Sequence, residues 1–263
     1  SEPSLSPRWR EFLFNSSSVF EPVAIITLSK TTSDSESLVL NVSKTPLSKT
    51  FIFRTSVPIK ISAPLLKTLA TSFRHKIKNF FVKNNKSRSK ENIRKHYDLG
   101  NEFFSLWLDK TLTYSSAIFE EGNNLEEAQI NKYKKLSNLV RPKSGDKMLE
   151  IGCGWGGFAE YIGKNYDVKL DCITISKKQF EYSKERVHKN GLNEKINIQM
   201  LDFRDIKNKY NSIASIEMIE AVGHNYLKNY FNTIKQNLLD GGTAAIQAIT
   251  IDDSIYDSCL LYT

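Results

Sequence analysis

The residues best suited to chemistry lie in one run of the sequence, EIGCGWGG at positions 150–157. Apolar residues 147–149 before it predict a buried strand, and residues 158–162 after it predict a helix. A strand, glycine-rich turn and helix present backbone N–H groups and a helix N-terminus to a nucleotide-like ligand. The glycines permit positive φ and close approach of a ligand, and the carboxylate could accept hydrogen bonds from a ribose or an amino group. The candidate cofactor-binding residues of this run are Glu150, Gly152, Cys153, Gly154 and Gly156.

The end of the second predicted strand distinguishes between a dinucleotide and other nucleotide-like ligands. The glycines also match the dinucleotide pattern G-x-G-x-x-G, which by itself is weak evidence. A dinucleotide site expects an acidic residue at the end of the next strand, about 20 residues on. The predicted strand 168–176 ends in Thr174, Ile175 and Ser176, and its only acid, Asp171, lies in the middle. This favours S-adenosylmethionine, which has no pyrophosphate; the alternative is a tight turn without a ligand.

Strands and helices alternate through the second half of the chain and must position this run. Short connections between them predict a parallel sheet covered on both faces, that is, an α/β fold. Ligands of such sheets bind outside the carboxyl ends of the strands. The predicted helices span 126–140, 177–190 and 227–239, and the later strands span 197–201, 212–218 and 244–251. The loops expected around one crevice carry Gly152, Ser176, Asp202, Glu220 and Gln247.

Two further features concern this crevice. Asp202 could hold an adenine amino group with Phe203 against the ring, and the alternative for Asp202 is a turn or cap residue. Aromatic residues are dense before the glycine run, and we expect most of them to pack in the core. They are Tyr97, Phe103, Phe104, Trp107, Tyr114 and Phe119.

Composition indicates a globular protein with an anionic partner. The chain has 263 residues, 40% hydrophobic and 25% charged, with a net charge of +8. No stretch approaches the ~20 apolar residues of a membrane span, and no signal peptide is visible. The three cysteines show neither metal-ligand nor disulfide spacing, which predicts a reducing, cytoplasmic location and no metal. The charge suits a phospholipid surface, a nucleic acid or an acidic small molecule.

The first third of the chain divides into two regions. Residues 1–62 show short apolar alternations and predict a small antiparallel β-rich region of unknown role. Residues 63–90 predict a basic amphipathic helix and a linker. This segment either lies on an anionic membrane surface or packs on the core before a solvated linker. No nucleic-acid motif accompanies the charge, so we expect no nucleic-acid partner.

Five motifs in order give a resemblance to a known family. HYDLGN at 96–101, TYSSAIF at 113–119, EIGCGWG at 150–156, TIS at 174–176 and SIEMIEAVGH at 215–224 resemble the cyclopropane-fatty-acyl-phospholipid synthases and the mycolic acid cyclopropane synthases. The resemblance covers residues 90–252, within a predicted domain at 91–263. It implies a seven-stranded, Rossmann-like methyltransferase fold. It also implies methyl transfer from S-adenosylmethionine to the cis double bond of an unsaturated phospholipid acyl chain, with ring closure to a cyclopropane.

The resemblance assigns roles to particular positions. It implies a bicarbonate ion as the base, positioned by Glu220 and a backbone contact at Ile249. Ser116 and Gln247 belong to the same ion-binding cluster but replace the Cys and His of mycolic members. Glu220 could instead pair with His224 or cap the next helix. Tyr114 could contact the cofactor, stabilise a cation or pack in the core. The cofactor positions implied are Tyr114, Ser115, Gly152, Gly154, Thr174, Ile175, Ser176, Gln179, Asp202 and Phe203.

The end of the chain departs from the family pattern. The family continues with a helix, two strands and a tyrosine at the ion site, and residues 258–263 do not resemble that continuation. We therefore expect a truncated domain whose fifth strand exposes an edge. Two other functions remain open: a methyltransferase acting on another small molecule, and an inactive remnant that binds anionic membrane through residues 62–95. The expected location is cytoplasmic, peripheral to the inner face of the membrane.

Overall fold

A computed structural model describes residues 23–30, 38–43, 101–223 and 226–250. Its centre is one seven-stranded sheet. The strands, in chain order, are β1 (Val23–Lys30), β2 (Leu38–Ser43), β3 (Lys147–Ile151), β4 (Lys169–Thr174), β5 (Ile196–Met200), β6 (Tyr210–Ile216) and β7 (Leu238–Ile249).

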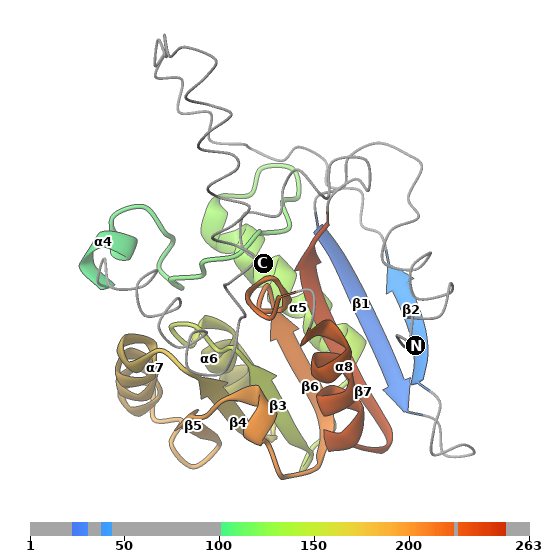
Figure 1. The fold of residues 1–263 in the computed structure, drawn as a ribbon. Helices are drawn as coiled ribbons and strands as arrows, with labels where there is room; N and C mark the ends of the chain where they lie inside the picture. Colours follow the sequence, from blue (N-terminus) through green and yellow to red (C-terminus); the bar gives the residue numbers. More distant parts are fainter. Residues whose placement is uncertain (1–22, 31–37, 44–100, 224–225, 251–263) are drawn as a thin grey trace, which may run out of the picture.

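The sheet order is β2-β1-β7-β6-β3-β4-β5 (Figure 1). Strands β7, β6, β3, β4 and β5 are mutually parallel, as the alternating pattern of the sequence predicts. Strand order reverses beside β3, because β4 lies on one side of it and β6 on the other. In open α/β sheets this switch point is where ligands bind, outside the carboxyl ends of the strands. The run at 150–157 begins at the end of β3, so the fold puts it at this point.

Helices cover both faces of the sheet. One face is covered by α5 (Leu125–Val140), α6 (Gly157–Asn165) and α7 (Lys177–Lys189), and the other by α8 (Leu227–Asn237). Adjacent strand residues point to opposite faces: Met148 packs with the α5–α6 core, and Leu149 packs with the α8 core. This explains why apolar residues follow one another directly within β3, because both faces of the sheet are buried there. Short elements complete the chain: α4 (Asn101–Ser105), η1 (Phe203–Asp205) and η2 (Ile219–Ala221).

The expected exposed edge at the fifth strand is wrong. Strand β1 pairs antiparallel with β7 along seven residue pairs, from Val23 opposite Ile249 to Ser29 opposite Thr243. Strand β2 then pairs antiparallel with β1. The β1–β2 hairpin therefore extends the main sheet and occupies the backbone hydrogen-bonding groups of β7. Ile25 and Leu28 lie in the two cores on opposite faces, which holds this added strand by packing as well as by hydrogen bonds.

Other expectations for the N-terminal third lie outside the described residues. These are the amphipathic helix and linker at 63–90, Tyr97 and the first motif up to residue 100, together with the remainder of 1–62. The strand expected around residues 38–42 is confirmed as β2. His224 also lies outside the described residues.

Candidate active site

The turn between β3 and α6, here called the glycine turn (residues 152–157), has three glycines with positive φ. They are Gly152 at +81°, Gly154 at +53° and Gly156 at +81°. A Cβ on Gly152 would lie 2.8 Å from the Met218 Cγ, so packing requires glycine there. A Cβ on Gly154 would meet nothing within 4 Å. Gly154 is therefore where the turn is open to a ligand.

Glu150 is buried beside this turn, with 2% of its surface exposed. Its Oε2 accepts a weak hydrogen bond from the Cys172 thiol at 3.4 Å. Burial raises the pKa of Glu150 to about 7, because a carboxylate loses hydration there. A ligand hydroxyl or amino group would restore those hydrogen bonds, which suits the predicted role. Burial also raises the pKa of Cys153 and of Cys172, so these thiols are structural and unreactive.

The turn from β4 into α7 brings three predicted residues together. Ser176 is the N-cap of α7, and its side chain accepts a hydrogen bond from the Gln179 N–H. The Thr174 hydroxyl donates to Gln179 Oε1 at 3.0 Å and accepts from the Ser176 N–H at 3.2 Å. All three side chains are buried, whereas Ile175 between them is half-buried. This network fixes the second loop of the crevice before any ligand arrives.

Asp202 takes the cap position that was the alternative for it. Its side chain accepts from the Arg204 N–H at the start of η1, and its two oxygens accept from the Arg204 guanidinium at 2.8 and 2.7 Å. Phe203 packs against Tyr230, with ring centroids 5.6 Å apart. An adenine contact at Asp202 therefore stays a prediction, and it would compete with an ion pair already formed.

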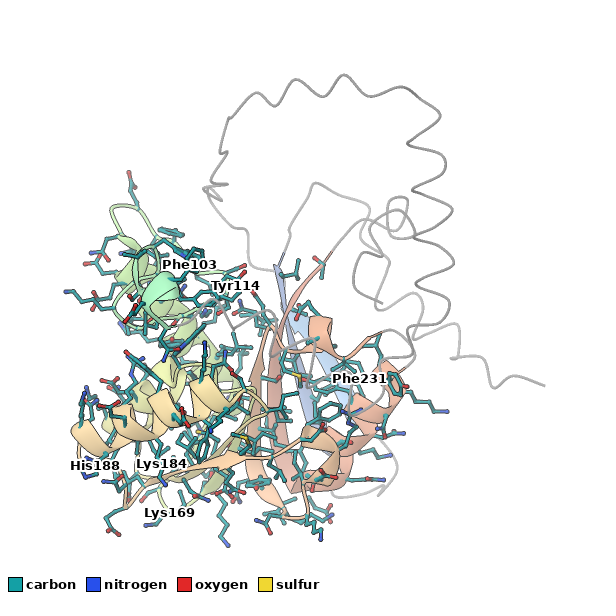
Figure 2. All side chains as sticks on the ribbon, turned by 60° about the vertical axis from the view of Figure 1, so that its left-hand side comes forward. Phe103, Tyr114, Lys169, Lys184, His188 and Phe231 are labelled. Atoms are coloured by element: carbon teal, nitrogen blue, oxygen red, sulfur yellow. The ribbon has the colours of Figure 1, made fainter. Side chains whose placement is uncertain are left out.

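The aromatic cluster before the glycine turn differs from our expectation of a core. Phe104 is buried, whereas Phe103, Trp107 and Tyr114 are each more than 40% exposed. Of its two rings, the short helix α4 buries only Phe104, and Trp107 and Tyr114 lie in the irregular chain after α4. The Tyr114 ring lies 5.4 Å from both the Phe104 and Trp107 rings. Figure 2 shows Phe103 and Tyr114 on this α4 side of the molecule, away from Phe231 on α8.

Lys132 of α5 lies below the same loop and is completely buried. Its Nζ donates to the Ser115 hydroxyl at 2.6 Å. Burial lowers the pKa of Lys132 to about 7, against the opposing effects of the Glu217 and Asp109 charges. Gln129, one turn earlier, donates to the Ser115 carbonyl at 2.9 Å. Helix α5 thus holds the Ser115 loop at the carboxyl edge of the sheet.

Residues after β6 and residues in the last part of strand β7 join that loop in a cluster of polar groups, the carboxylate cluster (Ser116, Glu217, Glu220, Gln247 and Ile249). Glu217 Oε1 accepts from the Ser116 N–H at 2.9 Å and from the Gln247 amide at 2.8 Å. The same amide donates to the Ser116 carbonyl at 3.1 Å. Glu220 Oε1 accepts from the Ile249 N–H at 2.6 Å. Burial, and secondarily the Glu217 charge, raise the pKa of Glu220.

The sequence that builds this site matches a known family. The sequence profile described as "Mycolic acid cyclopropane synthetase" matches residues 84–258, more than half of the chain. The chain belongs to the mycolic acid cyclopropane synthetase family. The resemblance drawn from five sequence motifs is thereby confirmed.

Curated relatives of this family member include two bacterial lipid enzymes. A "Probable fatty acid methyltransferase" of Pseudomonas putida is 39% identical over 163 residues, covering 61% of this chain and 41% of the relative. The "Cyclopropane-fatty-acyl-phospholipid synthase" of Escherichia coli is 39% identical over 156 residues, covering 59% of this chain and 40% of the relative. The chain thus spans about two fifths of the length of these relatives.

Solved structures agree with the family's fold. Mycolic acid cyclopropane synthase CmaA1, complexed with SAH and CTAB, superposes with a TM-score of 0.58 at 30% identity, covering 60% of this chain and 55% of that one. Coclaurine N-methyltransferase superposes with a TM-score of 0.53 at 20% identity, covering 69% of this chain and 56% of that one, which concerns the fold alone. The predicted Rossmann-like methyltransferase fold is confirmed.

Sequence reasoning did not single out two residues that the structure places at the candidate site, Glu217 and Lys132. Glu217 stands three positions before Glu220 in a motif that was visible, but only the second acid was assigned a role. Lys132 carried no signal, because α5 has three lysines and the sequence does not distinguish the buried one from the two others. The departures at Ser116 and Gln247 were identified, and the structure places both against Glu217.

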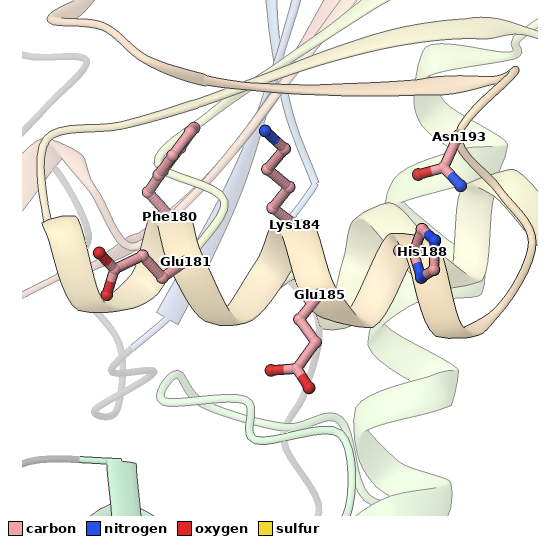
Figure 3. Close-up of a pocket in the computed structure, with 6 residues that line it drawn as sticks. All are labelled: Phe180, Glu181, Lys184, Glu185, His188 and Asn193. Atoms are coloured by element: carbon pink, nitrogen blue, oxygen red, sulfur yellow. The ribbon is translucent and has the colours of Figure 1, made fainter.

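Outside the candidate active site, the described residues form no second candidate site. A hollow of about 470 Å³ lies on the outer side of α7, lined by Phe180, Glu181, Lys184, Glu185, His188 and Asn193 (Figure 3). None of these residues belongs to the predicted site. Within the described ranges no cluster of acidic, His or Cys side chains could hold a metal ion. No helix in the described part of the chain has the length and apolarity to cross a membrane.

Proposed function

We propose that the chain binds S-adenosylmethionine and transfers its methyl group to the cis double bond of an unsaturated phospholipid acyl chain, forming a cyclopropane. The observation that carries this proposal is the open Gly154 position beside a buried Glu150 at the switch point of the sheet. Family membership and the relative named as a cyclopropane-fatty-acyl-phospholipid synthase support the substrate class.

The chain's own residues have defined tasks in this proposal. S-adenosylmethionine supplies an electrophilic sulfonium methyl group. Glu150 accepts hydrogen bonds from the ligand, and the Gly154 position lets the ligand lie close to the backbone. The exposed faces of Trp107 and Tyr114 stabilise positive charge on the acyl chain without attacking it. Burial of the reacting carbon between these elements keeps water from trapping the cation.

The bicarbonate base implied by the resemblance fits these residues poorly. The Ser116 N–H and the Gln247 amide already donate to Glu217, and the Ile249 N–H donates to Glu220. A further anion would displace these bonds and stand beside two carboxylates. The proposed reaction therefore contains no step through that ion.

We also propose that the chain meets its lipid substrate at the inner face of the membrane, from the cytoplasm. The net charge of +8 favours an anionic surface. Phe103, Leu106 and Trp107 expose apolar area beside the candidate site, which is where an acyl chain would enter. Binding to anionic and to neutral vesicles, compared by sedimentation at two salt concentrations, tests this part of the proposal.

The first experiment is calorimetric titration of the chain with S-adenosylmethionine, repeated with Gly154→Asp. The aspartate side chain would enter the space that the ligand needs, so binding should be lost. Gly191→Asp is the matched control, because Gly191 also has positive φ, at +66°, with nothing within 4 Å, but lies beyond α7. Equal binding by Gly154→Asp and the control would contradict the assignment of the crevice.

Product analysis then separates two outcomes of the same methyl transfer. Ring closure gives a cyclopropane, and loss of a different proton gives a methyl-branched or methylene chain. The Pseudomonas putida relative, named a fatty acid methyltransferase, makes the second outcome a specific alternative. Proton NMR of lipids after incubation with unsaturated phospholipid vesicles distinguishes the two. A methylated amine or alcohol with unchanged lipid would instead favour the small-molecule alternative.

A further inference from the structure

The carboxylate cluster contains a carboxylate that the family resemblance did not assign. Glu217 Oε1 is held by two donors, the Ser116 N–H and the Gln247 amide. The orientation of that amide is set by its surroundings, since its Nε2 faces two acceptors, Glu217 Oε1 and the Ser116 carbonyl. Turning it over would oppose oxygen to oxygen. Glu217 therefore uses the very groups that would otherwise hold a small carboxylate-like anion.

The backbone of Glu217 is strained to achieve this. Its φ is +46°, in the left-handed region that residues with a Cβ adopt rarely, at a cost of about 1 kcal/mol or more. Its N–H donates to the Gln247 carbonyl at 2.9 Å, which fixes the conformation directly after β6. The strained residue lies at the carboxyl end of the sheet, between the strand and η2. Such a conformation persists where the surrounding structure imposes it, and it turns this side chain toward the Ser116 loop.

The second oxygen of Glu217 receives no hydrogen bond from the described residues, and the side chain is only partly buried. One oxygen is thus anchored and the other is available to take a proton. Glu220 lies three residues further on, and its Oε1 accepts a hydrogen bond from the Ile249 N–H. The side chain of Lys132 is completely buried, and its charge interacts with that of Glu217.

We propose that Glu217 is the built-in base of this chain and takes the place of an external carboxylate or bicarbonate ion. This inference rests on the proposed function. The alkene π pair forms a bond to the methyl carbon as the carbon–sulfur pair leaves with sulfur, and the neighbouring chain carbon becomes a cation. Glu217 Oε2 then removes a proton from the new methyl group, and the released C–H pair closes the ring on the cationic carbon. The proton passes from Glu217 to Glu220 and to water.

The experiment uses the full chain with S-adenosylmethionine and vesicles of unsaturated phosphatidylethanolamine and phosphatidylglycerol, in buffer depleted of carbon dioxide. The wild-type chain should form product at the same rate with and without added bicarbonate. Glu217→Gln keeps an acceptor for the Ser116 N–H and the Gln247 amide but is not basic. It should lower cyclopropane formation by about 100-fold or more, with unchanged affinity for S-adenosylmethionine. Glu181→Gln on α7 is the control and should leave both unchanged.

A second variant separates a base from a structural residue. Glu217→Gly suits the left-handed backbone and leaves the Ser116 N–H and one N–H of the Gln247 amide without their acceptor, while the amide keeps its hydrogen bond to the Ser116 carbonyl. Added bicarbonate or formate should bind this variant in a calorimetric titration and restore its turnover, whereas the wild-type chain should bind neither. A merely structural Glu217 would show no rescue.

Two results would overturn the proposal. One is wild-type turnover that stops in depleted buffer and returns with bicarbonate. The other is bicarbonate binding that is equal in the wild type and in Glu217→Gly. Failure of the wild-type chain to bind S-adenosylmethionine would contradict the proposed function instead, and the bicarbonate titration would still test whether Glu217 occupies the anion's place.

Discussion

The glycine turn and the carboxylate cluster lie at the same edge of the sheet, but the chain builds them in different ways. The glycine turn is one continuous stretch between β3 and α6, and its geometry follows from local φ angles. The carboxylate cluster joins residues as far as 131 positions apart, Ser116 and Gln247. A local motif can thus be recognised from the amino-acid sequence. The carboxylate cluster forms only when folding brings β6, β7 and the Ser116 loop together.

The two regions also differ in how their polar groups are satisfied. Beside the glycine turn, the weak bond from the Cys172 thiol is the only hydrogen bond that the Glu150 carboxylate accepts from the described residues, which leaves it ready for a ligand. In the carboxylate cluster, the donors already have protein acceptors. The glycine turn is therefore suited to bind a ligand, and the carboxylate cluster is suited to accept a proton. A substitution in one region, followed by measurement of both cofactor binding and product formation, shows whether the other region depends on it.

The largest expected effect is on stability, from Gly152→Ala. The added Cβ would lie 2.8 Å from the Met218 Cγ and on a backbone with φ of +81°. We expect the free energy of unfolding to fall by about 3 kcal/mol, measured by urea denaturation. Because Met218 follows Glu217 directly, product formation should fall too, which would join the two regions. Gly154→Ala, with open space around it, should lower stability by only about 1 kcal/mol.

Lys132→Met should separate stability from activity. Replacing a buried charge with an apolar side chain of similar length is expected to stabilise the fold by about 2 kcal/mol. The pKa of Lys132 is lowered from 10.5 to about 7 in the folded state, so the folded chain binds fewer protons between these values. The stability of the wild type therefore rises with pH across that window, and the advantage of the variant should shrink. Thermal unfolding at pH 6 and pH 9 checks this. A variant that is less stable at pH 6 would contradict it.

The same variant should affect the two regions unequally. Loss of the Lys132 charge removes the cation opposite Glu217 and the donor to Ser115, so product formation should fall. The Lys132 ammonium donates to Ser115, whereas Glu150 accepts from Cys172, so S-adenosylmethionine affinity should change less than turnover does. A larger loss of affinity than of turnover would show that α5 serves the cofactor rather than the carboxylate cluster.

Cofactor affinity should depend on the ionisation of Glu150. Burial raises the pKa of Glu150 to about 7, and hydrogen bonds from a bound ligand favour the anion. Binding should therefore release a proton below pH 7, and affinity should fall by up to about tenfold for each pH unit below that value. Calorimetry in two buffers of different ionisation enthalpy measures the proton. Glu150→Gln is the control: it should lose this component and retain any contribution from Lys132 or from the ligand.

The smallest effect should come from Ser176→Ala. Ser176 caps α7, and removal of an N-cap hydroxyl lowers stability by about 1 kcal/mol. Thr174 and Gln179 would keep their own hydrogen bond. S-adenosylmethionine affinity should decline modestly, and the proportion of ring-closed product should not change. A change in that proportion would mean that the cofactor loops also control the base.

Much of the fold was predictable because each element carries a local signal. The apolar residues at β3, β4 and β6 indicated buried strands, and the pattern of residues 177–190 indicated a helix. The β1–β7 pairing was not predictable, since hydrogen bonding between distant strands depends on backbone groups that every residue has. The exposure of Trp107 and Tyr114 was also missed, because aromatic residues favour the core and the sequence does not show that these two lie in irregular chain after α4.

The sequence by itself determined the family, the α/β order of the strands and the position of the glycine turn, because these depend on spacing within short segments. Only the tertiary structure decided which polar groups face one another. Of the three lysines of α5, packing buried Lys132. Packing also directed the Glu217 side chain toward Ser116 and Gln247. Burial and long-range hydrogen bonds arise from packing of the whole sheet, and they set the charge and proton affinity of the residues at its carboxyl edge.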